Sequence, residues 1–282
     1  MAKQRLDTLL VNLNLCTSRQ QAQALIRTGK VAVNQQVVDK PGTEVDITAK
    51  IQIKERSRYV SRGGDKLAKA LEVFAIPVTD RICLDGGIST GGFTDCLLQA
   101  GAAKVYGIDV GYGQADWGLR NDPRVILKER TNLRYMTATE LYGDSQRADL
   151  AVVDVSFISL DKVLPALWEL LAPPREAVLL VKPQFEVGRE RVGKKGVVRD
   201  SATQADAIFQ VWKAATALGW EQRGLTWSPL LGPAGNIEYL LWLGSDRQQQ
   251  SEQNAVEDSV MKERIAEVTK GAKGELIDRF EV

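Results

Sequence analysis

The chain has 282 residues, of which 44% are hydrophobic and 26% charged, and its formal net charge is +1. This composition is typical of a globular protein, and the length accommodates one α/β domain with a smaller second domain. No apolar run approaches the roughly 20 residues of a membrane span. The amino-terminal stretch MAKQRLDTLL lacks the apolar core of a signal peptide.

The residue types restrict the possible chemistry. The sequence contains no histidine, which excludes Ser-His and Cys-His triads and histidine zinc sites. Proton transfer must then use Lys, Asp, Glu, Tyr or Cys side chains, or water. The three cysteines, Cys16, Cys83 and Cys96, show no metal or disulfide spacing. We therefore expect no bound metal and a reduced, cytoplasmic environment.

Residues 1–53 are predicted to form a small α+β domain. Leucines at helical spacing predict its first helix, and Ser18 is placed to cap the second, which Gly29 ends. The expected elements are helices at 5–15 and 19–28, a hairpin at 31–38 and a strand at 44–53.

The first sixty residues are the basic part of the chain, since they carry ten Lys or Arg and five Asp or Glu, a local charge of +5. These charges could form a solvated helix face. Against this, Arg19, Arg27 and Lys30 lie on or just after one short helix, where they could contact successive phosphates.

A resemblance favours the RNA-binding interpretation. The segment RLDTLLVNLNLCTSRQQAQALIRTGKVAVNQQVVDKPG resembles the small RNA-binding domain found in ribosomal small-subunit protein four, many pseudouridine synthases and tyrosyl-tRNA synthetases. This resemblance implies binding of structured RNA through shape and backbone. The expected RNA-binding residues are Arg5, Ser18, Arg19, Arg27, Lys30, Arg58 and Arg62.

Strands and helices alternate after a charged linker at 54–60. Over residues 61–244 the strands are almost continuously apolar, which indicates a mostly parallel, buried sheet with helices on both faces. The expected helices are 65–74, 93–99, 160–171 and 202–218, and the expected strands are 82–85, 104–109, 125–128, 149–154, 177–182, 221–228 and 237–242. The remaining residues, 245–282, predict a flexible polar tail, with a docked helix as the alternative.

A glycine-rich loop joins the first strand of this domain to a helix, in RICLDGGISTGGF at 81–93. Glycines allow tight turns and close approach of a ligand, and N–H groups at a helix start can donate to it. Such loops also serve only for packing, so the loop alone leaves both interpretations open. Its GGISTGG spacing differs from the dinucleotide pattern GxGxxG.

Three charged residues end predicted strands on the side of the sheet where ligands bind in such folds. Asp109 follows the loop by about twenty residues, where a carboxylate can accept both hydroxyls of a ribose. Lys182 completes the apolar run AVLLV, and a buried lysine needs a carboxylate partner. Asp154 can supply it from the neighbouring strand. The alternatives are a strand-end cap at Asp109 and a purely structural ion pair at Lys182.

A series of motifs resembles the TlyA family over residues 5–243. In chain order these are SRGGDKL, LDGGISTGGFTD, DVGYGQ, LRNDPRV, ERTN, VDVSFISL, LVKPQFEVG and GPAGNIEYLLWL. The family, historically labelled haemolysins, consists of ribosomal RNA 2′-O-methyltransferases with an FtsJ-type catalytic domain. The resemblance therefore implies a Rossmann-like methyltransferase fold, S-adenosylmethionine as cofactor and ribosomal RNA or ribosomal subunits as partners.

Two positions depart from the family pattern. Gly64-Asp65 stands where Ala-His is common, and Ile88 stands where a small residue is usual. We expect the first to alter RNA contacts and the second to tighten the cofactor loop.

The resemblance also implies the site residues. The FtsJ-type tetrad Lys-Asp-Lys-Glu falls on Lys66, Asp154, Lys182 and Glu238. The ERTN segment, 129–132, is expected beside the adenine. The cofactor-binding residues implied are Asp85, Gly86, Gly87, Ser89, Thr90, Gly91, Gly92, Phe93, Asp109, Val110, Asn132 and Asp154.

The implied chemistry needs one proton to leave a ribose hydroxyl. That hydroxyl is a poor nucleophile, whereas the sulfonium cofactor carries an activated methyl group, so the protein must align the atoms and ease deprotonation. A neutral lysine can take the proton if a second ammonium and desolvation lower its proton affinity. We assign Lys182 as the base and Lys66 as its partner, with Asp154 and Glu238 orienting the amines. The lysines can exchange roles, because coupled groups titrate together.

Two other functions stand as alternatives. A catalytically silent RNA-binding or assembly factor would keep the fold, although the intact cofactor loop and complete tetrad argue against it. A pore-forming haemolysin would need a membrane span or export signal, which the sequence lacks. We expect a cytoplasmic, monomeric enzyme that modifies a cytidine ribose in large-subunit RNA, with small-subunit RNA as a second option.

Overall fold

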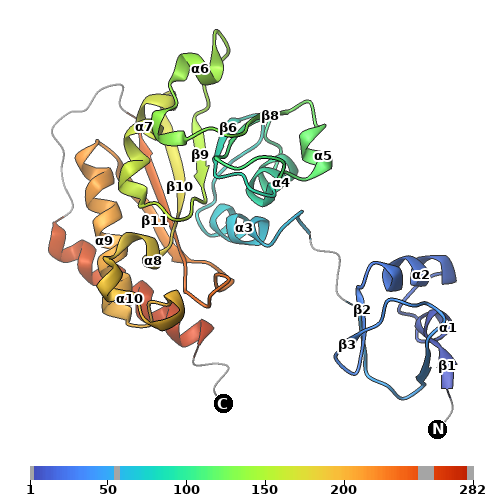
Figure 1. Ribbon diagram of the computed structural model, residues 1–282. Coiled ribbons are helices and arrows are strands. Elements are labelled where there is room, and N and C mark those ends of the chain that lie inside the picture. Colours follow the sequence, from blue (N-terminus) through green and yellow to red (C-terminus); the bar gives the residue numbers. More distant parts are fainter. Residues whose placement is uncertain (1–2, 54–57, 247–256, 278–282) are drawn as a thin grey trace. The chain divides into compact units, whose positions relative to one another are not determined.

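The structure is a computed structural model that describes residues 3–53, 58–246 and 257–277. It divides the chain into two compact units, Met1–Ser57 and Arg58–Val282 (Figure 1). Each unit has a hydrophobic core of its own.

The first unit combines two helices with two small sheets. Its elements are β1 (Lys3–Arg5), α1 (Leu6–Asn12), α2 (Arg19–Arg27), β2 (Val31–Val33), β3 (Gln36–Val37), β4 (Glu44–Asp46) and β5 (Ile51–Ile53). β2 lies between β3 and β5, and β1 pairs with β4. Leu6, Leu10 and Ile26 are fully buried between the helices and sheets. The hydroxyl of Ser18 accepts a hydrogen bond from the N–H of Gln21 at 3.2 Å, which confirms the predicted cap of α2.

The single strand predicted over 44–53 is wrong, because β4 and β5 belong to different sheets. The chain turns between them at Asp46, whose carboxylate accepts hydrogen bonds from the N–H and the hydroxyl of Thr48 at 2.9 and 2.7 Å. An aspartate that bonds two residues ahead in this way competes with strand pairing.

The second unit is built on a seven-stranded sheet, which confirms the predicted α/β class (Figure 1). Its strands are β6 (Ile82–Gly86), β7 (Lys104–Ile108), β8 (Val125–Lys128), β9 (Leu150–Val153), β10 (Arg175–Val181), β11 (Glu221–Trp227) and β12 (Tyr239–Ser245). The spatial order is β11-β12-β10-β9-β6-β7-β8. β6 to β10 run parallel, and β12 is antiparallel to both β10 and β11. The carboxyl ends of five parallel strands therefore meet at one edge.

Helices cover both faces of this sheet. They are α3 (Gly63–Val73), α4 (Gly92–Gln99), α5 (Trp117–Arg120), α6 (Ala138–Tyr142), α7 (Leu164–Leu170), α8 (Pro183–Glu186), α9 (Ser201–Ala217) and α10 (Asp258–Leu276), with 3-10 turns at Leu133–Tyr135, Leu160–Lys162, Arg189–Arg191 and Lys194–Gly196. α3 and α4 pack with Cys83 on one face, whereas α6, α7 and α9 pack with Leu84 on the other. Neighbouring residues of β6 thus serve opposite cores, as the alternation of side chains along a strand requires.

The helix predicted over 160–171 is divided into a 3-10 turn and α7. Pro165 lies in the first turn of α7, where its missing N–H costs no hydrogen bond and its fixed φ suits a helix start. A proline at this place begins a helix rather than continuing one, which the apolar spacing alone did not indicate.

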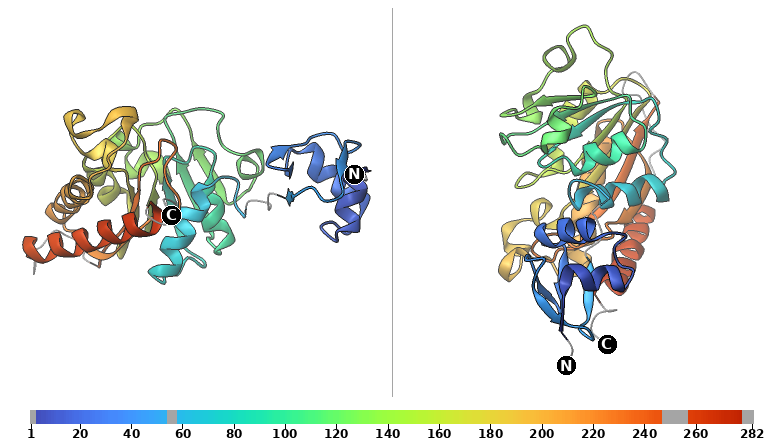
Figure 2. Two further views of the ribbon diagram at one scale, coloured as in Figure 1. Left: turned by 90° about the horizontal axis from the view of Figure 1, so that it is seen from below. Right: turned by 90° about the vertical axis from the view of Figure 1, so that its right-hand side faces the viewer.

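The flexible tail expected after residue 245 is wrong for residues 258–276, where the alternative, a docked helix, is confirmed as α10. This helix packs against α9 and the edge strand β11 (Figure 2). Met261, Ile265 and Ala272 are buried on its inner face, and Lys213 of α9 lies 2.9 Å from the carboxylate of Asp258. The Gln-rich part of the predicted tail, 247–256, lies outside the described residues.

The predicted linker 54–60 falls partly outside the described residues, at 54–57. Its last residues lie against α4: Tyr59 is buried, and the N–H of Val60 donates to the carboxylate of Asp95 at 2.8 Å. The first residues of the second unit thus pack against α4, the helix that follows the glycine-rich loop.

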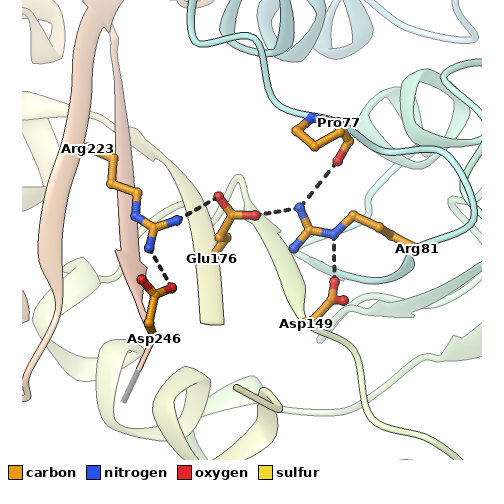
Figure 3. Close-up of polar contacts among 6 residues, drawn as sticks. All are labelled: Pro77, Arg81, Asp149, Glu176, Arg223 and Asp246. Atoms are coloured by element: carbon orange, nitrogen blue, oxygen red, sulfur yellow. Dashed lines mark hydrogen bonds and ion pairs between the residues drawn. The ribbon is translucent and has the colours of Figure 1, made fainter. Parts of the chain in front are cut away.

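An ion-pair network joins the strands at the edge opposite the glycine-rich loop (Figure 3). The carboxylate of Glu176 accepts from Arg81 at 2.5 Å and from Arg223 at 3.2 Å. Arg81 also donates to Asp149 at 2.7 Å, and Arg223 to Asp246 at 2.8 Å. The two arginines compensate the charge of Glu176, which allows this residue to lie within β10. The strand therefore begins at Arg175, two residues before the predicted start at residue 177.

Candidate active site

The predicted site residues gather at the carboxyl edge of the parallel strands, beside the glycine-rich loop. β6, which leads into the loop, pairs with β9, which leads to Asp154. Gly87 has a φ of +88°, and a Cβ at this position would lie 2.5 Å from the backbone oxygen of Asp154. Only glycine allows the loop to pass this close to the neighbouring strand end.

Two lysine–carboxylate pairs form the centre of the site. The amine of Lys182 lies 2.5 Å from Asp154 Oδ1, which confirms the predicted ion pair. The amine of Lys66, a residue of α3, lies 2.5 Å from Oε2 of Glu238. Glu238 directly precedes β12. Both lysines are more than nine-tenths buried, and Glu238 is 1% exposed. All four side chains line one cavity of about 890 Å³.

Lys182 has a further neighbour that the sequence analysis missed. Its amine donates to the hydroxyl of Ser156 at 2.8 Å. Ser156 stands two residues after Asp154 in VDVSFISL, so a polar side chain this close to a functional strand end was the available signal.

A second cavity, of about 470 Å³, lies on the other side of Asp154. Asp109 stands on its wall, and its two carboxylate oxygens accept hydrogen bonds from the N–H groups of Ser89 at 2.8 Å and Gly111 at 2.7 Å. Each oxygen keeps lone pairs for further donors such as ribose hydroxyls. Of the predicted cofactor-binding residues, those lining this cavity are Gly87, Ser89, Asp109, Val110, Asn132 and Asp154.

A third cavity, of about 210 Å³, adjoins the glycine-rich loop at the start of α4 and is also lined by Lys66 and Asp154. The predicted residues Thr90, Gly92 and Phe93 stand on its wall, together with Arg62. Asp154 lines all three cavities. Space for a nucleoside-sized ligand and space for a substrate therefore meet at the lysine–carboxylate pairs.

Asp85, Gly86 and Gly91 line none of these cavities. Asp85 is fully buried and accepts a hydrogen bond from the hydroxyl of Thr94 at 2.6 Å, which fastens the end of β6 to α4. Burial raises the pKa of Asp85 to about 7, and the nearby Asp154 and Asp109 add to the shift. Its place in the structure is that of a support beneath the loop.

The two departures from the family pattern have local explanations. A Cβ at Gly64 would lie 2.2 Å from the ring of Tyr59, so the buried tyrosine requires glycine there. Ile88 is 4% exposed, and its Cδ1 occupies the space in which a Cβ of Gly107 would lie. The larger side chain is accommodated because the neighbouring strand carries a glycine.

Two of the predicted RNA-binding residues of the first unit, Arg5 and Arg19, contact a carboxylate that sequence reasoning missed. Asp7 is fully buried and accepts from Arg5 at 2.9 Å, Arg19 at 3.1 Å and Gln23 at 2.9 Å. The guanidinium of Arg5 holds the pKa of Asp7 well below its usual range, and Gln23 and Arg19 contribute to this shift. Arg5 and Arg19 remain about half exposed, whereas the Ser18 hydroxyl is used in capping α2.

The other predicted RNA-binding residues are dispersed. Arg27 is exposed at the end of α2, and Lys30 is half-buried just beyond it. Arg58 and Arg62 are exposed at the start of the second unit, with the guanidinium of Arg58 5.2 Å from the ring of Tyr59.

Comparisons with known proteins agree with this division of the chain. Residues 59–245 match the FtsJ-like methyltransferase family, and residues 4–51 match the S4 domain. A 16S/23S rRNA (cytidine-2'-O)-methyltransferase TlyA from Mycobacterium tuberculosis is 49% identical, over 91% of this chain and 95% of that protein. Hemolysin A of Brachyspira hyodysenteriae is 40% identical, over 84% of this chain and 98% of that protein.

A solved structure shows the same arrangement of elements. It is a Streptococcus thermophilus protein that carries a hemolysin name, with 41% sequence identity, a TM-score of 0.75 and complete coverage of both chains. Within residues 3–53, 58–246 and 257–277 of this chain, no helix is long and apolar enough to cross a membrane.

Proposed function

Because this chain belongs to the FtsJ-like methyltransferase family, in its TlyA branch, we propose that it methylates the 2′-hydroxyl of a cytidine ribose in ribosomal RNA. The methyl donor is S-adenosylmethionine, and the reaction takes place in the cytoplasm, where ribosomal RNA is modified. The observation that carries the proposal is Asp154, which lines the nucleoside-sized cavity and at the same time holds Lys182 at 2.5 Å.

The residues around the 470 Å³ cavity suit this donor. S-adenosylmethionine supplies, when bound, a methyl group activated by a sulfonium. Asp109 offers two acceptors to the ribose hydroxyls, and Gly87 leaves its backbone accessible beside Asp154. Val110 and Asn132 stand on the wall of the same cavity and would hold the adenine.

The lysine–carboxylate cluster handles the proton of the ribose hydroxyl. Lys182 takes it as the base, and Asp154 and Ser156 fix the direction of its amine. Lys66, held by Glu238, donates a hydrogen bond to the same hydroxyl. Two amines and two carboxylates thus face one cavity, in which the reacting hydroxyl is to be held.

Transfer of a labelled methyl group to ribosomal subunits tests the proposal. We expect methylation by the wild type and a loss of about a hundredfold or more with Lys182→Ala, the usual range for removal of a general base. Lys162→Ala is the matched control, because Lys162 is an exposed lysine of the neighbouring 3-10 turn and lines none of the three cavities. It should retain full activity.

If the wild type transfers no methyl group to any ribosomal particle but still binds it, the chain is a silent RNA-binding or assembly factor. If the wild type does transfer a methyl group, mapping 2′-O-methyl groups on ribosomal RNA from cells with and without the gene identifies the modified nucleotide. The same map decides between the large-subunit RNA alone and both subunits.

A further inference from the structure

Two exposed aromatic rings and two arginines lie beside the cofactor cavity and have no part in the chemistry proposed above. Tyr112 is 65% exposed and Trp117, in α5, is 78% exposed. Arg120 and Arg130 are the arginines, and both are exposed. We refer to these four residues as the aromatic surface.

Glu129 connects the segment that carries Tyr112 to Arg120 of α5. Its carboxylate accepts from the N–H of Gly113, next to Tyr112, at 2.7 Å, and from the guanidinium of Arg120 at 2.6 and 3.0 Å. Arg120 lies three residues after Trp117 in α5, and residues at this spacing share one side of a helix.

Arg130 completes the surface from the other side. Its N–H donates to the backbone oxygen of Gly111 at 2.9 Å, and its guanidinium lies 4.3 Å from the centre of the Tyr112 ring. The aromatic surface is therefore held by backbone, carboxylate and cation–π contacts, while its two rings remain largely exposed.

α5 also rests on the loop that we propose holds the cofactor. The N–H of Asp116, which caps α5, donates to the backbone oxygen of Thr90 at 3.0 Å. The side chain of Leu119 fills the space beside Gly91, where a Cβ would lie 2.3 Å from it. Val110 and Gln114, on either side of Tyr112 in the sequence, line the cofactor cavity.

Exposed rings beside guanidinium groups match one ligand chemistry well. Unpaired nucleobases stack on aromatic side chains and on arginine planes, and the adjacent phosphates attract the positive charge. The carboxylate of Glu129, which lies between these residues, already accepts three hydrogen bonds from Gly113 and Arg120.

We propose that the aromatic surface binds an unpaired segment of the substrate RNA, with Tyr112 and Trp117 stacking on bases and Arg120 and Arg130 contacting phosphates. The proposal rests on the function proposed above and adds a second RNA contact, on the catalytic unit itself. RNA bound at this surface lies against α5, which contacts the glycine-rich loop at Thr90 and Gly91.

The first test is the affinity for protein-free large-subunit ribosomal RNA. Trp117→Ala should weaken binding and raise the KM for RNA by about 5- to 150-fold, the range for loss of one stacked base, with kcat unchanged. Trp117→Phe keeps a ring and should stay close to the wild type. Trp117→Leu keeps an apolar side chain without a ring and should behave like Trp117→Ala.

Fluorescence gives a readout that a structural role would not change. Trp117 is the most exposed of the tryptophans for which the structure describes a side chain. RNA binding should quench its emission by stacking, and the RNA-dependent quenching should disappear in Trp117→Phe while binding persists. The affinity for S-adenosylmethionine, measured without RNA, should be the same in all variants.

Three results would overturn the proposal while leaving the methyltransferase assignment intact. In the first, the wild type methylates ribosomes and Trp117→Ala does so with an unchanged KM. In the second, cofactor affinity falls as much as RNA affinity, so that the rings serve the cofactor loop. In the third, Trp117→Ala weakens binding to intact subunits but not to protein-free RNA, which would identify a ribosomal protein as the partner.

Discussion

Two oxygen atoms lie next to the amine of Lys182. Together they fix the direction in which the third position on its nitrogen points. The amine lies 2.5 Å from Asp154 Oδ1 and 2.8 Å from the hydroxyl of Ser156. A neutral lysine amine has two N–H groups and one lone pair, so with both N–H groups directed at these acceptors the lone pair is left for the proton of the ribose hydroxyl. Ser156→Ala frees the amine to rotate, and we expect kcat to fall about tenfold, equivalent to ~1.4 kcal/mol. Single-turnover methyl transfer measures this effect directly.

The hydroxyl, rather than the size of the side chain, is responsible for this expected loss. Ser156→Thr retains the hydroxyl and should recover most of the activity, whereas Ser156→Ala should fold normally because residue 156 is exposed. A Ser156→Ala enzyme with the wild-type kcat would show that Asp154 alone orients the amine.

The two lysine pairs differ in how far the sequence could predict them. Asp154 and Lys182 end β9 and β10, which are neighbours, so alternation of strands and helices was enough to bring them together. Lys66 and Glu238 are 172 residues apart, and Lys66 lies on a helix before the sheet begins. No periodicity encodes that contact, and only the family resemblance indicated it.

At the scale of elements, a clasp joins the segments that carry Asp154 and Lys182. Glu186, in α8, accepts hydrogen bonds from the hydroxyl of Ser159 at 2.6 Å and from the N–H of Leu160 at 3.1 Å. The rings of Phe157 and Phe185 contact each other at 5.1 Å. Because these contacts lie just after Asp154 and just after Lys182, they hold together the two segments that carry this pair.

Glu186 makes this clasp dependent on pH. Burial raises its pKa from 4.5 to about 7, so the native state holds this proton more tightly than the unfolded chain between these values. The free energy of unfolding therefore falls as pH rises from about 4.5 to 7 and is level above 7. Glu186→Gln removes this dependence, and its Tm should vary less than that of the wild type over the same window.

Thermal unfolding between pH 5 and 8 measures the difference. Glu190→Gln is the control, since Glu190 is exposed in the adjacent 3-10 turn and should follow the wild-type curve. Equal pH dependence of Tm in Glu186→Gln and the wild type would show that another group is responsible.

The elements that escaped prediction share a physical cause. α5 and α8 have four residues each, which is little more than one turn, so hydrophobic spacing cannot reveal them. α8 begins with Pro183, a residue suited to a helix start, directly after Lys182. These short helices depend on contacts that form only in the folded unit. Leu119 of α5 packs beside Gly91, and Glu186 of α8 accepts a hydrogen bond from the N–H of Leu160.

For the whole molecule, charge is divided unequally between the two units. The first unit, residues 1–57, holds nine Lys or Arg and five Asp or Glu, a charge of +4, so the second unit carries 1 − 4 = −3. Attraction to RNA phosphates is therefore concentrated in the first unit. We expect Arg27→Ala to weaken ribosome binding and to reduce the slope of log K against log salt by about 0.7 to 0.9, the loss of one phosphate contact.

Arg19→Ala should differ from Arg27→Ala, although both remove one exposed arginine of α2. Arg19 lies 3.1 Å from the buried carboxylate of Asp7, which also holds Arg5 and Gln23. Its loss leaves a buried charge with fewer donors, so we expect Arg19→Ala to lower both RNA affinity and the Tm of the protein. Arg27→Ala should lower RNA affinity alone. If the arginines only solvate a helix face, neither substitution will change the salt dependence of ribosome binding, and Arg19→Ala will affect stability alone.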